Sequence, residues 1–316
     1  YDKGFRHCDI LIIGAGATGL SAALTAANSG AKIILADEDF LMGGRLNSET
    51  NEIDGMAGNE WAKKTVAKLG AMENVTLMSD TTVFGAYDHG IYGAIENRAS
   101  EAREDNDKPR QVNWRIYTKR AILCAGATER LIAFGNNDRP GIMLASAVRT
   151  YLNRFAVATG QRISVYTNND DGWKTAKDLN AKGFRVAAVI DSRSISPVMR
   201  VPGAEIYMAT DVVDTKGRRA LKSIQLSNGK SIDTDTLAVS GGWNPNLHFT
   251  CHHRGVPKWN EEIASFVPDS SPPIGMSVAG RAKGTMVLAD AIIEGHNQGS
   301  CVAADLGYKT SESKPA

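Results

Sequence analysis

The sequence predicts an α/β fold in which a Rossmann-like dinucleotide-binding domain is interrupted by a second, inserted α/β domain. Three observations support this. The apolar run Ile10–Ile13 leads directly into the glycine-rich loop Gly14–Gly19. Strand-like and helix-like segments alternate over residues 10–36 and again over residues 163–190. The chain has 316 residues, and an average domain has roughly 150.

The first domain begins with an alternation of strand and helix. Ile10–Ile13 is a continuous apolar run of the kind found in buried parallel strands. The alanine-rich segment Leu20–Asn28 is helical and ends at Gly30, which suits a helix C-terminus. Ile33–Ala36 is the second strand, and Glu60–Met72 is a further helix. Five β segments follow: Val75–Met78, Thr82–Tyr87, Ile91–Glu96, Val112–Tyr117 and Arg120–Cys124. The charged span Arg98–Arg110 is expected to be an exposed hairpin loop.

The second α/β unit is expected after the helix Ala145–Phe155. Its predicted elements are the strand Ile163–Tyr166, the helix Trp173–Lys182, and strands at Arg185–Ile190, Ile206–Ala209 and Ser223–Leu226. Asn228-Gly229 is a hairpin signal before Ser231–Ile232. Leu237–Ser240 is expected to return to the first sheet, and Met286–His296 is the last helix. The predicted division is 1–156 plus 236–316 for the dinucleotide-binding domain and 157–235 for the insertion.

Composition excludes several classes of partner. The 36 basic and 35 acidic residues leave a net charge of +1, and no basic tract carries interleaved aromatics, so neither nucleic acid nor a membrane is expected as a partner. The four cysteines form no C-x-x-C pair and no disulfide framework. We expect reduced, mostly buried thiols in a cytoplasmic protein. The chain starts at Tyr1 rather than Met and ends in a polar tail, so we expect a piece of a longer polypeptide.

The loop Gly14–Gly19 carries the strongest functional signal. It follows a strand, opens a helix, and precedes an acid, Asp37, at the end of the next strand. Gly14 permits the tight turn, Gly16 lets the backbone approach a pyrophosphate, and Gly19 lets the helix pack closely on the strand. The helix start at Ala17 and Thr18 offers free N–H groups to phosphates. Asp37 is placed to bind ribose hydroxyls, and its neighbour Glu38 is expected to face solvent.

Further segments are expected to approach the same ligand. In two-dinucleotide, FAD/NAD(P)-binding oxidoreductases a Gly-Gly pair after the second strand brings backbone against the cofactor, and Gly43-Gly44-Arg45-Leu46 matches this. An ordinary loop is the alternative, with Arg45 at the surface. Residues 121–130 resemble the A-T-G-A motif of the same enzymes, with Cys124 as a small buried residue. The remaining candidates here are Val83, Ala125, Gly126 and Arg130.

The inserted domain lacks a second phosphate loop. After its first strand the sequence is Thr167-Asn168-Asn169-Asp170-Asp171-Gly172-Trp173. The required glycines are missing, and two acids stand where phosphates would bind. We therefore expect this domain to keep the Rossmann-like form without a ligand.

A third candidate segment is Val278–Gly284, which contains Gly280 and Arg281. FAD enzymes of this fold have Gly-Asp here, and the Asp accepts a hydrogen bond from the ribityl chain. A guanidinium cannot accept that bond, which favours NAD, with FAD as the alternative. The next helix is expected to begin near Thr285 and to point at the ligand. Cys251-His252-His253 has poor spacing for a metal site and is expected to be a loop.

These motifs together resemble the α subunit of heterotetrameric sarcosine oxidases. The resemblance rests on the segments Gly14–Gly19, Cys124–Arg130, Asn137–Arg154, Val239–Pro245 and Ala264–Asp269, and spans nearly the whole chain. The complete complex of that family oxidatively demethylates sarcosine, yielding glycine and hydrogen peroxide, or methylenetetrahydrofolate with tetrahydrofolate. The resemblance implies β, γ and δ partner subunits, FAD on β, and FMN at the α–β interface attached to β.

The resemblance also implies that this region holds NAD as a non-redox ligand and is inactive alone, while folate chemistry belongs to another part of the α subunit. Three alternatives stay open from the residues: an autonomous FAD-dependent oxidoreductase, the α subunit of an opine or proline dehydrogenase-type complex, and an assembly module with an empty pocket. No catalytic residue is assigned.

Overall fold

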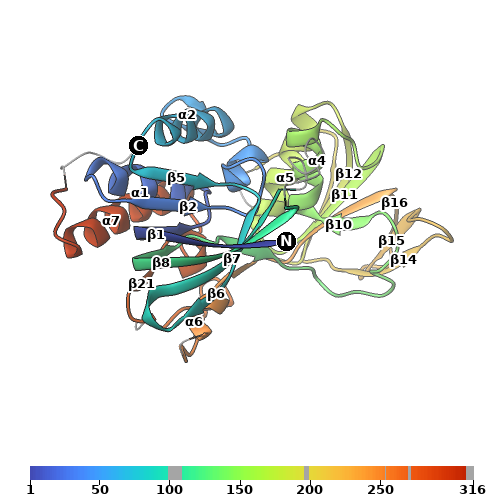
Figure 1. The fold of residues 1–316 in the computed structure, drawn as a ribbon. Coiled ribbons are helices and arrows are strands. Elements are labelled where there is room, and N and C mark those ends of the chain that lie inside the picture. The colour runs from blue at the N-terminus through green and yellow to red at the C-terminus, as the bar shows by residue number, and fades with distance from the viewer. Residues whose placement is uncertain (99–108, 196–198, 253, 270–271, 311–316) are drawn as a thin grey trace. The chain divides into compact units, whose positions relative to one another are not determined.

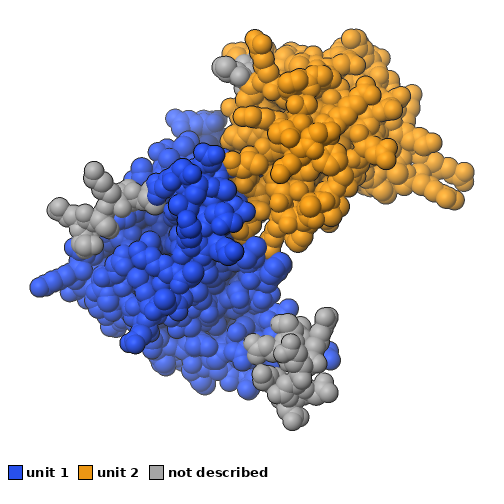
Figure 2. Space-filling view, turned by 90° about the horizontal axis from the view of Figure 1, so that it is seen from above, with its two compact units in different colours: residues 1–46, 51–127, 245–316 blue, residues 47–50, 128–244 orange. Residues whose placement is uncertain are grey.

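The computed structural model describes residues 1–98, 109–195, 199–252, 254–269 and 272–310. The chain forms two compact units (Figure 2). Unit 1 comprises Tyr1–Leu46, Asn51–Ala127 and Pro245–Ala316, and unit 2 comprises Asn47–Thr50 and Thr128–Asn244. Most of the expected hairpin loop Arg98–Arg110 lies outside the described residues.

The central sheet of unit 1 explains the alternation seen in the sequence. Among the described residues it has seven strands, in the order β5-β2-β1-β8-β7-β6, with β21 also paired to β8. The strands are β1 (Asp2–Ile13), β2 (Ile33–Ala36), β5 (Val75–Met78), β6 (Thr81–Tyr87), β7 (Ile91–Asn97), β8 (Gln111–Leu123) and β21 (Met276–Val278). The pairs β5–β2, β2–β1, β1–β8 and β8–β21 are parallel, whereas β8–β7 and β7–β6 are antiparallel.

Two strands are longer than the sequence pattern indicates. β1 begins at Asp2, eight residues before the apolar run, and β8 joins two predicted segments into one. The outer half of β1 alternates in burial because it pairs with β8 away from the buried core, from Asp2↔Val112 onward. Apolar runs mark only the part of a strand that is covered on both faces.

Helices α1 (Ala17–Asn28), α2 (Gly58–Gly70) and α7 (Leu288–Asp305) belong to the same unit and pack against this sheet (Figure 1). α1 and α7 pack side by side at very close range. A Cβ at Gly295 would lie 2.2 Å from the carbonyl oxygen of Thr18, and a Cβ at Gly299 would lie 2.4 Å from that of Ala22. Glycine is therefore needed inside α7, which continues nine residues beyond the predicted end at His296.

Unit 2 has a parallel sheet of its own. Its order is β10-β17-β11-β12-β13, and the strands are β10 (Ile142–Leu144), β17 (Thr236–Ser240), β11 (Arg162–Thr167), β12 (Arg185–Asp191) and β13 (Glu205–Met208). Helices α4 (Ala145–Phe155) and α5 (Asp170–Ala181) pack on it. β14 (Val212–Lys216), β15 (Ser223–Leu226) and β16 (Ser231–Asp233) form an antiparallel sheet with the predicted turn at Asn228-Gly229.

The expected return of Leu237–Ser240 to the first sheet is wrong. β17 lies between β10 and β11, pairing Leu237 with both Ile142 and Ser164. An apolar strand carries no signal for which of two sheets it joins. The same pairing draws β10 and α4 into unit 2, so this unit is larger than the expected insertion 157–235.

Short elements complete the described chain. The remaining strand pairs are β3 (Glu52–Ile53) with β4 (Met56–Ala57), β9 (Ala127–Glu129) with β18 (Trp243–Pro245), and β19 (Lys258–Asn260) with β20 (Ser265–Val267). The 3₁₀ turns are η1 (Gly44–Asn47), η2 (Asp88–Gly90) and η3 (Gly280–Lys283), and α6 (His248–Cys251) is a single helical turn. In the described part of the chain, we find no helix with the length and apolar character needed to cross a bilayer.

Candidate dinucleotide site

The loop Gly14–Gly19 connects the end of β1 to α1, as the sequence predicts. Gly14 has φ +99°, and its N–H donates to the carbonyl oxygen of Ala36 at 2.8 Å. A Cβ at Gly14 would lie 2.5 Å from the carbonyl oxygen of Cys124, and a Cβ at Gly19 would lie 1.8 Å from that of Gly14. These two glycines therefore serve the protein itself, because they let β1, β8 and α1 meet.

Gly16 differs from the two glycines beside it. It is the N-cap of α1, no side chain caps that helix end, and a Cβ at Gly16 would have no protein atom within 4 Å. The first turn of the helix, starting at Ala17 and Thr18, leaves N–H groups without intrahelical acceptors. A glycine that faces open space at an uncapped helix end suits the approach of an anionic group such as a pyrophosphate.

The second glycine pair lies beside this loop. Gly43 donates its N–H to the carbonyl oxygen of Ala15 at 2.9 Å, and a Cβ at Gly44 would lie 3.0 Å from the Cα of Gly16. Gly44 has φ +54°, in the left-handed region that favours glycine. Arg45 lies next in η1, half-buried, and Leu46 is buried in the core of unit 1.

Asp37 lies directly after β2, at the same edge of the sheet. Its Oδ2 accepts the N–H of Ala15, and its Oδ1 accepts the N–H of Asp39 at 2.9 Å. Burial raises the pKa of the Asp37 carboxyl above its usual value, against the lowering effect of these two hydrogen bonds. Glu38 is exposed, as expected.

The third segment is adjacent to the loop, but its helix begins later than predicted. Gly280 has φ +68°, and a Cβ there would lie 2.2 Å from the Oγ1 of Thr18. Thr285 is not at the start of the helix, because η3 and an extended stretch precede α7 at Leu288. Its hydroxyl instead donates to Glu294 at 2.8 Å. Arg281 lies in η3, half-buried.

The remaining candidates divide between the two units. Ala125 and Gly126 follow β8, where Asn246 donates its side-chain amide to the carbonyl oxygen of Ala125 at 2.8 Å and its N–H to that of Gly126 at 3.0 Å. Val83 is buried in the core under the sheet. Arg130 belongs to unit 2, where its Nε donates to the carbonyl oxygen of Gly241 at 3.2 Å.

Sequence reasoning missed Asn246 and Glu294. Asn246 directly follows the segment Val239–Pro245, but a side chain that holds a distant backbone has no spacing signal. Glu294 has the pattern of an ordinary helix acid. Each side chain makes a hydrogen bond to a backbone group more than ten residues away in the sequence, so only the fold reveals these contacts.

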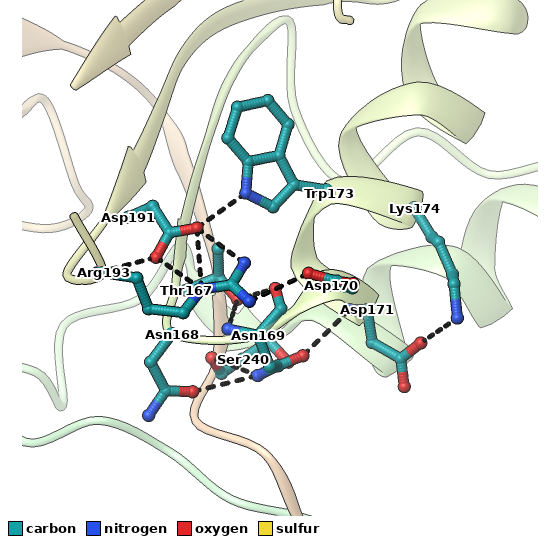
Figure 3. Close-up of polar contacts among 10 residues, drawn as sticks. All are labelled: Thr167, Asn168, Asn169, Asp170, Asp171, Trp173, Lys174, Asp191, Arg193 and Ser240. Atoms are coloured by element: carbon teal, nitrogen blue, oxygen red, sulfur yellow. Dashed lines mark hydrogen bonds and ion pairs between the residues drawn. The ribbon is translucent and has the colours of Figure 1, made fainter. Parts of the chain in front are cut away.

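The corresponding edge of unit 2 is filled by its own side chains (Figure 3). Asn169 Oδ1 accepts the N–H of Asp171 at 2.9 Å and so caps α5. Asp191, at the end of β12, is fully buried and accepts from Trp173 Nε1 at 2.7 Å and from Arg193 at 2.8 Å. Arg193 also pairs with Asp170 at 2.9 Å.

This network makes the start of α5 unsuited to bind a phosphate. The first turn of α5 is capped and carries two acids, and anions are disfavoured there. The acid at the strand end, which would meet a ribose, is already neutralised by Arg193. The loss of ligand binding in the inserted domain stays a prediction.

The cysteines and histidines that the structure describes are not grouped as metal ligands would be. Within the described residues there is no group of three His, Cys, Asp or Glu side chains placed to hold a metal ion. Cys251 ends the helical turn α6 rather than lying in a loop, and His253 lies outside the described residues. Cys8 and Cys124 are buried and Cys251 and Cys301 are exposed, so the expectation of mostly buried thiols holds for only half of them.

Comparison with known proteins shows which proteins this chain resembles. Residues 9–120 match the family of FAD dependent oxidoreductases. The chain is 42% identical to sarcosine oxidase subunit alpha of Rhizobium meliloti over 311 residues, which is 97% of this chain and 31% of that protein. It is 36% identical to the same subunit of Corynebacterium sp. over 98% of this chain and 34% of that protein.

The chain thus spans about a third of the length of these relatives and is homologous to them over almost all of its own length. Among solved structures, L-proline dehydrogenase from P. horikoshii has the same fold. The match covers 98% of this chain and 58% of the proline dehydrogenase chain, with a TM-score of 0.77 and 20% identity. The predicted α/β fold of the FAD/NAD(P)-binding type is confirmed.

Proposed function

We propose that this chain, a homologue of sarcosine oxidase alpha subunits over nearly its whole length, is the dinucleotide-binding portion of such a subunit. In the complete complex, with β, γ and δ subunits, the reaction would be the oxidative demethylation of sarcosine. The chain alone is expected to lack oxidase activity, because no catalytic residue is assigned among its residues and the capped, acidic start of α5 disfavours a second dinucleotide in unit 2.

One observation supports dinucleotide binding most directly. Gly16 lies at an uncapped helix end with no protein atom within 4 Å of a Cβ position, and Gly44 lies against it. The protein's own packing therefore does not explain a glycine at position 16, which indicates a ligand that needs close backbone approach. Gly16, Ala17, Thr18 and Gly44 would hold the pyrophosphate, and Asp37 would accept from a ribose.

We infer that the ligand is NAD, held as a structural group rather than as a hydride carrier. Arg281 lies in the turn after β21, where the FAD enzymes of this fold have an Asp acceptor, and a guanidinium cannot accept the ribityl hydroxyl. FAD is the second candidate, favoured by the family that matches residues 9–120. FAD, once bound, would supply a redox-active isoalloxazine ring, whereas this proposal needs only the adenine dinucleotide scaffold.

Chromatography of the nucleotide released by heat from the purified chain distinguishes these possibilities. Release of NAD from a colourless protein supports the proposal. Release of FAD from a yellow protein would replace it with the flavoprotein alternative. A protein that releases no nucleotide and shows no thermal shift with added NAD or FAD would be an assembly module.

A further inference from the structure

Glu294 on α7 fixes the turn that follows β21. Its Oε2 accepts the N–H of Gly280 at 2.8 Å and the hydroxyl of Thr285 at 2.8 Å, and its Oε1 accepts from the Lys283 ammonium at 2.6 Å. The Glu294 side chain is only 15% exposed. Hydrogen bonds to a carboxylate are shorter and stronger than those between neutral groups. One side chain therefore holds the turn at its start through the backbone of Gly280 and at its end through the side chain of Thr285.

This turn packs against the phosphate-binding end of α1. A Cβ at Gly280 would lie 2.2 Å from the Oγ1 of Thr18, and a Cβ at Gly295 would lie 2.2 Å from its carbonyl oxygen. Burial, and to a smaller extent the negative charge of Glu294, raise the pKa of the Cys124 thiol well above its usual range.

The order of the strands shows which half of a dinucleotide this turn would face. Asp37 follows β2, on one side of β1, whereas Gly280 follows β21, which pairs with β8 on the other side. A dinucleotide that crosses the carboxyl ends of the strands would place its adenosine ribose beside Asp37. Its second half would extend toward Gly280.

We propose that Glu294 is a positioning residue for the second half of the dinucleotide. Helix α7 supplies the carboxylate that orders the Gly280–Thr285 turn. The same turn contains the cation Arg281. Glu294 need not touch the ligand, because its hydrogen bonds go to the protein. This inference rests on the proposed dinucleotide binding and adds a residue that governs one half of the site.

The test compares ADP with NAD, which share the adenosine half. After removal of any bound nucleotide, calorimetry on the full chain measures the affinities for ADP and for NAD. In Glu294→Ala, NAD affinity should fall about tenfold while ADP affinity stays within twofold. Glu294→Gln should lose less, because an amide oxygen can still accept from Gly280. Lys283→Met is the matched control: it removes only an ammonium that is half exposed, so both affinities should change less than threefold.

Two results would overturn the positioning role. One is unchanged NAD affinity in Glu294→Ala. The other is an equal loss of ADP and NAD affinity with a lower unfolding temperature, which a purely structural role of Glu294 would produce; Glu294→Gln supplies the same comparison if the alanine variant does not fold. A wild-type chain that binds neither ligand would instead remove the proposed function itself, together with this inference.

Discussion

The carboxylate of Asp37 accepts a hydrogen bond from the backbone N–H of Ala15, inside the glycine loop. The acid at the end of the second strand therefore shapes the loop, in addition to its proposed role in binding a ribose. Its other oxygen accepts the N–H of Asp39. A carboxylate offers about four lone-pair positions, so acceptor capacity remains for ribose hydroxyls.

Replacing Asp37 should weaken nucleotide binding and remove a pH dependence. Burial raises the pKa of Asp37 above 3.8, so protonation begins at a higher pH than for an exposed aspartate. Because only the ionised form is a full acceptor, NAD affinity in the wild type should fall as pH is lowered toward that pKa. Asp37→Asn should bind about tenfold more weakly at neutral pH, as expected for one charge-assisted hydrogen bond.

Calorimetric titrations with NAD at several pH values between neutral and about one unit above the ordinary Asp pKa check this. Glu38→Gln is the matched control, because Glu38 is adjacent and exposed. An Asp37→Asn protein with the same pH profile as the wild type would show that another group controls binding.

Substitutions at Gly16 and Gly19 should have opposite consequences. Gly16→Val should fold normally, because a Cβ there meets no protein atom, but should lose its nucleotide. Gly19→Ala should lose about 1–3 kcal/mol of stability through overpacking against Gly14. Urea unfolding and the nucleotide content per chain separate the two effects. Gly70→Ala, in α2, is a control expected to change neither strongly. Full nucleotide retention by Gly16→Val would mean that the ligand lies elsewhere.

Exchanging Arg281 for an acid should change which dinucleotide is preferred. Arg281→Asp restores an acceptor for a ribityl hydroxyl, so FAD affinity should rise relative to NAD affinity by about tenfold. Competition between the two nucleotides on one preparation measures this ratio directly. An unchanged ratio would remove the argument that Arg281 selects NAD.

Two of the four thiols should react with a thiol reagent in the native chain, and the other two should be protected by burial. Burial raises the pKa of Cys8 from 9.0 to about 11, and Cys124 is buried as well, whereas Cys251 and Cys301 are exposed. At pH 8 a thiol reagent should label two cysteines in the native chain and four after unfolding. Mass spectrometry of labelled peptides identifies them, and rapid native labelling of Cys124 would contradict the packing described for β8.

The raised pKa of Cys8 predicts a loss of stability at alkaline pH. Unfolded Cys8 ionises near pH 9.0 and folded Cys8 near 11, so the folded state binds the proton more tightly. Stability should therefore fall as pH rises through this window, by about 2–3 kcal/mol from Cys8. Urea unfolding at pH 8 and pH 10.5 should show a smaller loss in Cys8→Ala than in the wild type; an equal loss would assign the effect to other groups.

The sequence predicts the local parts of the fold well. The strand, glycine loop and helix around Gly14–Gly19 and the hairpin at Asn228-Gly229 each depend on neighbouring residues, and each forms as expected. Sheet membership depends on distant pairing instead, and so the sheet that the sequence predicts for β17 is wrong. The end of α7 was misplaced because Gly299 is disfavoured in an isolated helix yet required against α1.

The candidate site divides in the same way. Gly16, Gly44 and Asp37 come together because short loops at one sheet edge bring them there, which the spacing alone indicates. The contacts of Glu294 and Asn246 depend on elements that return to this edge from far along the chain. No periodicity or motif marks such residues, because their role is defined only by the backbone groups they reach.

The identity of the nucleotide released by heat from the purified chain tests the central claim most directly. We predict close to one NAD per chain, no flavin absorbance, and no retained nucleotide in Gly16→Val. Stoichiometric FAD from the wild-type chain would contradict the assignment of NAD, and the same nucleotide content in wild type and Gly16→Val would contradict the site itself.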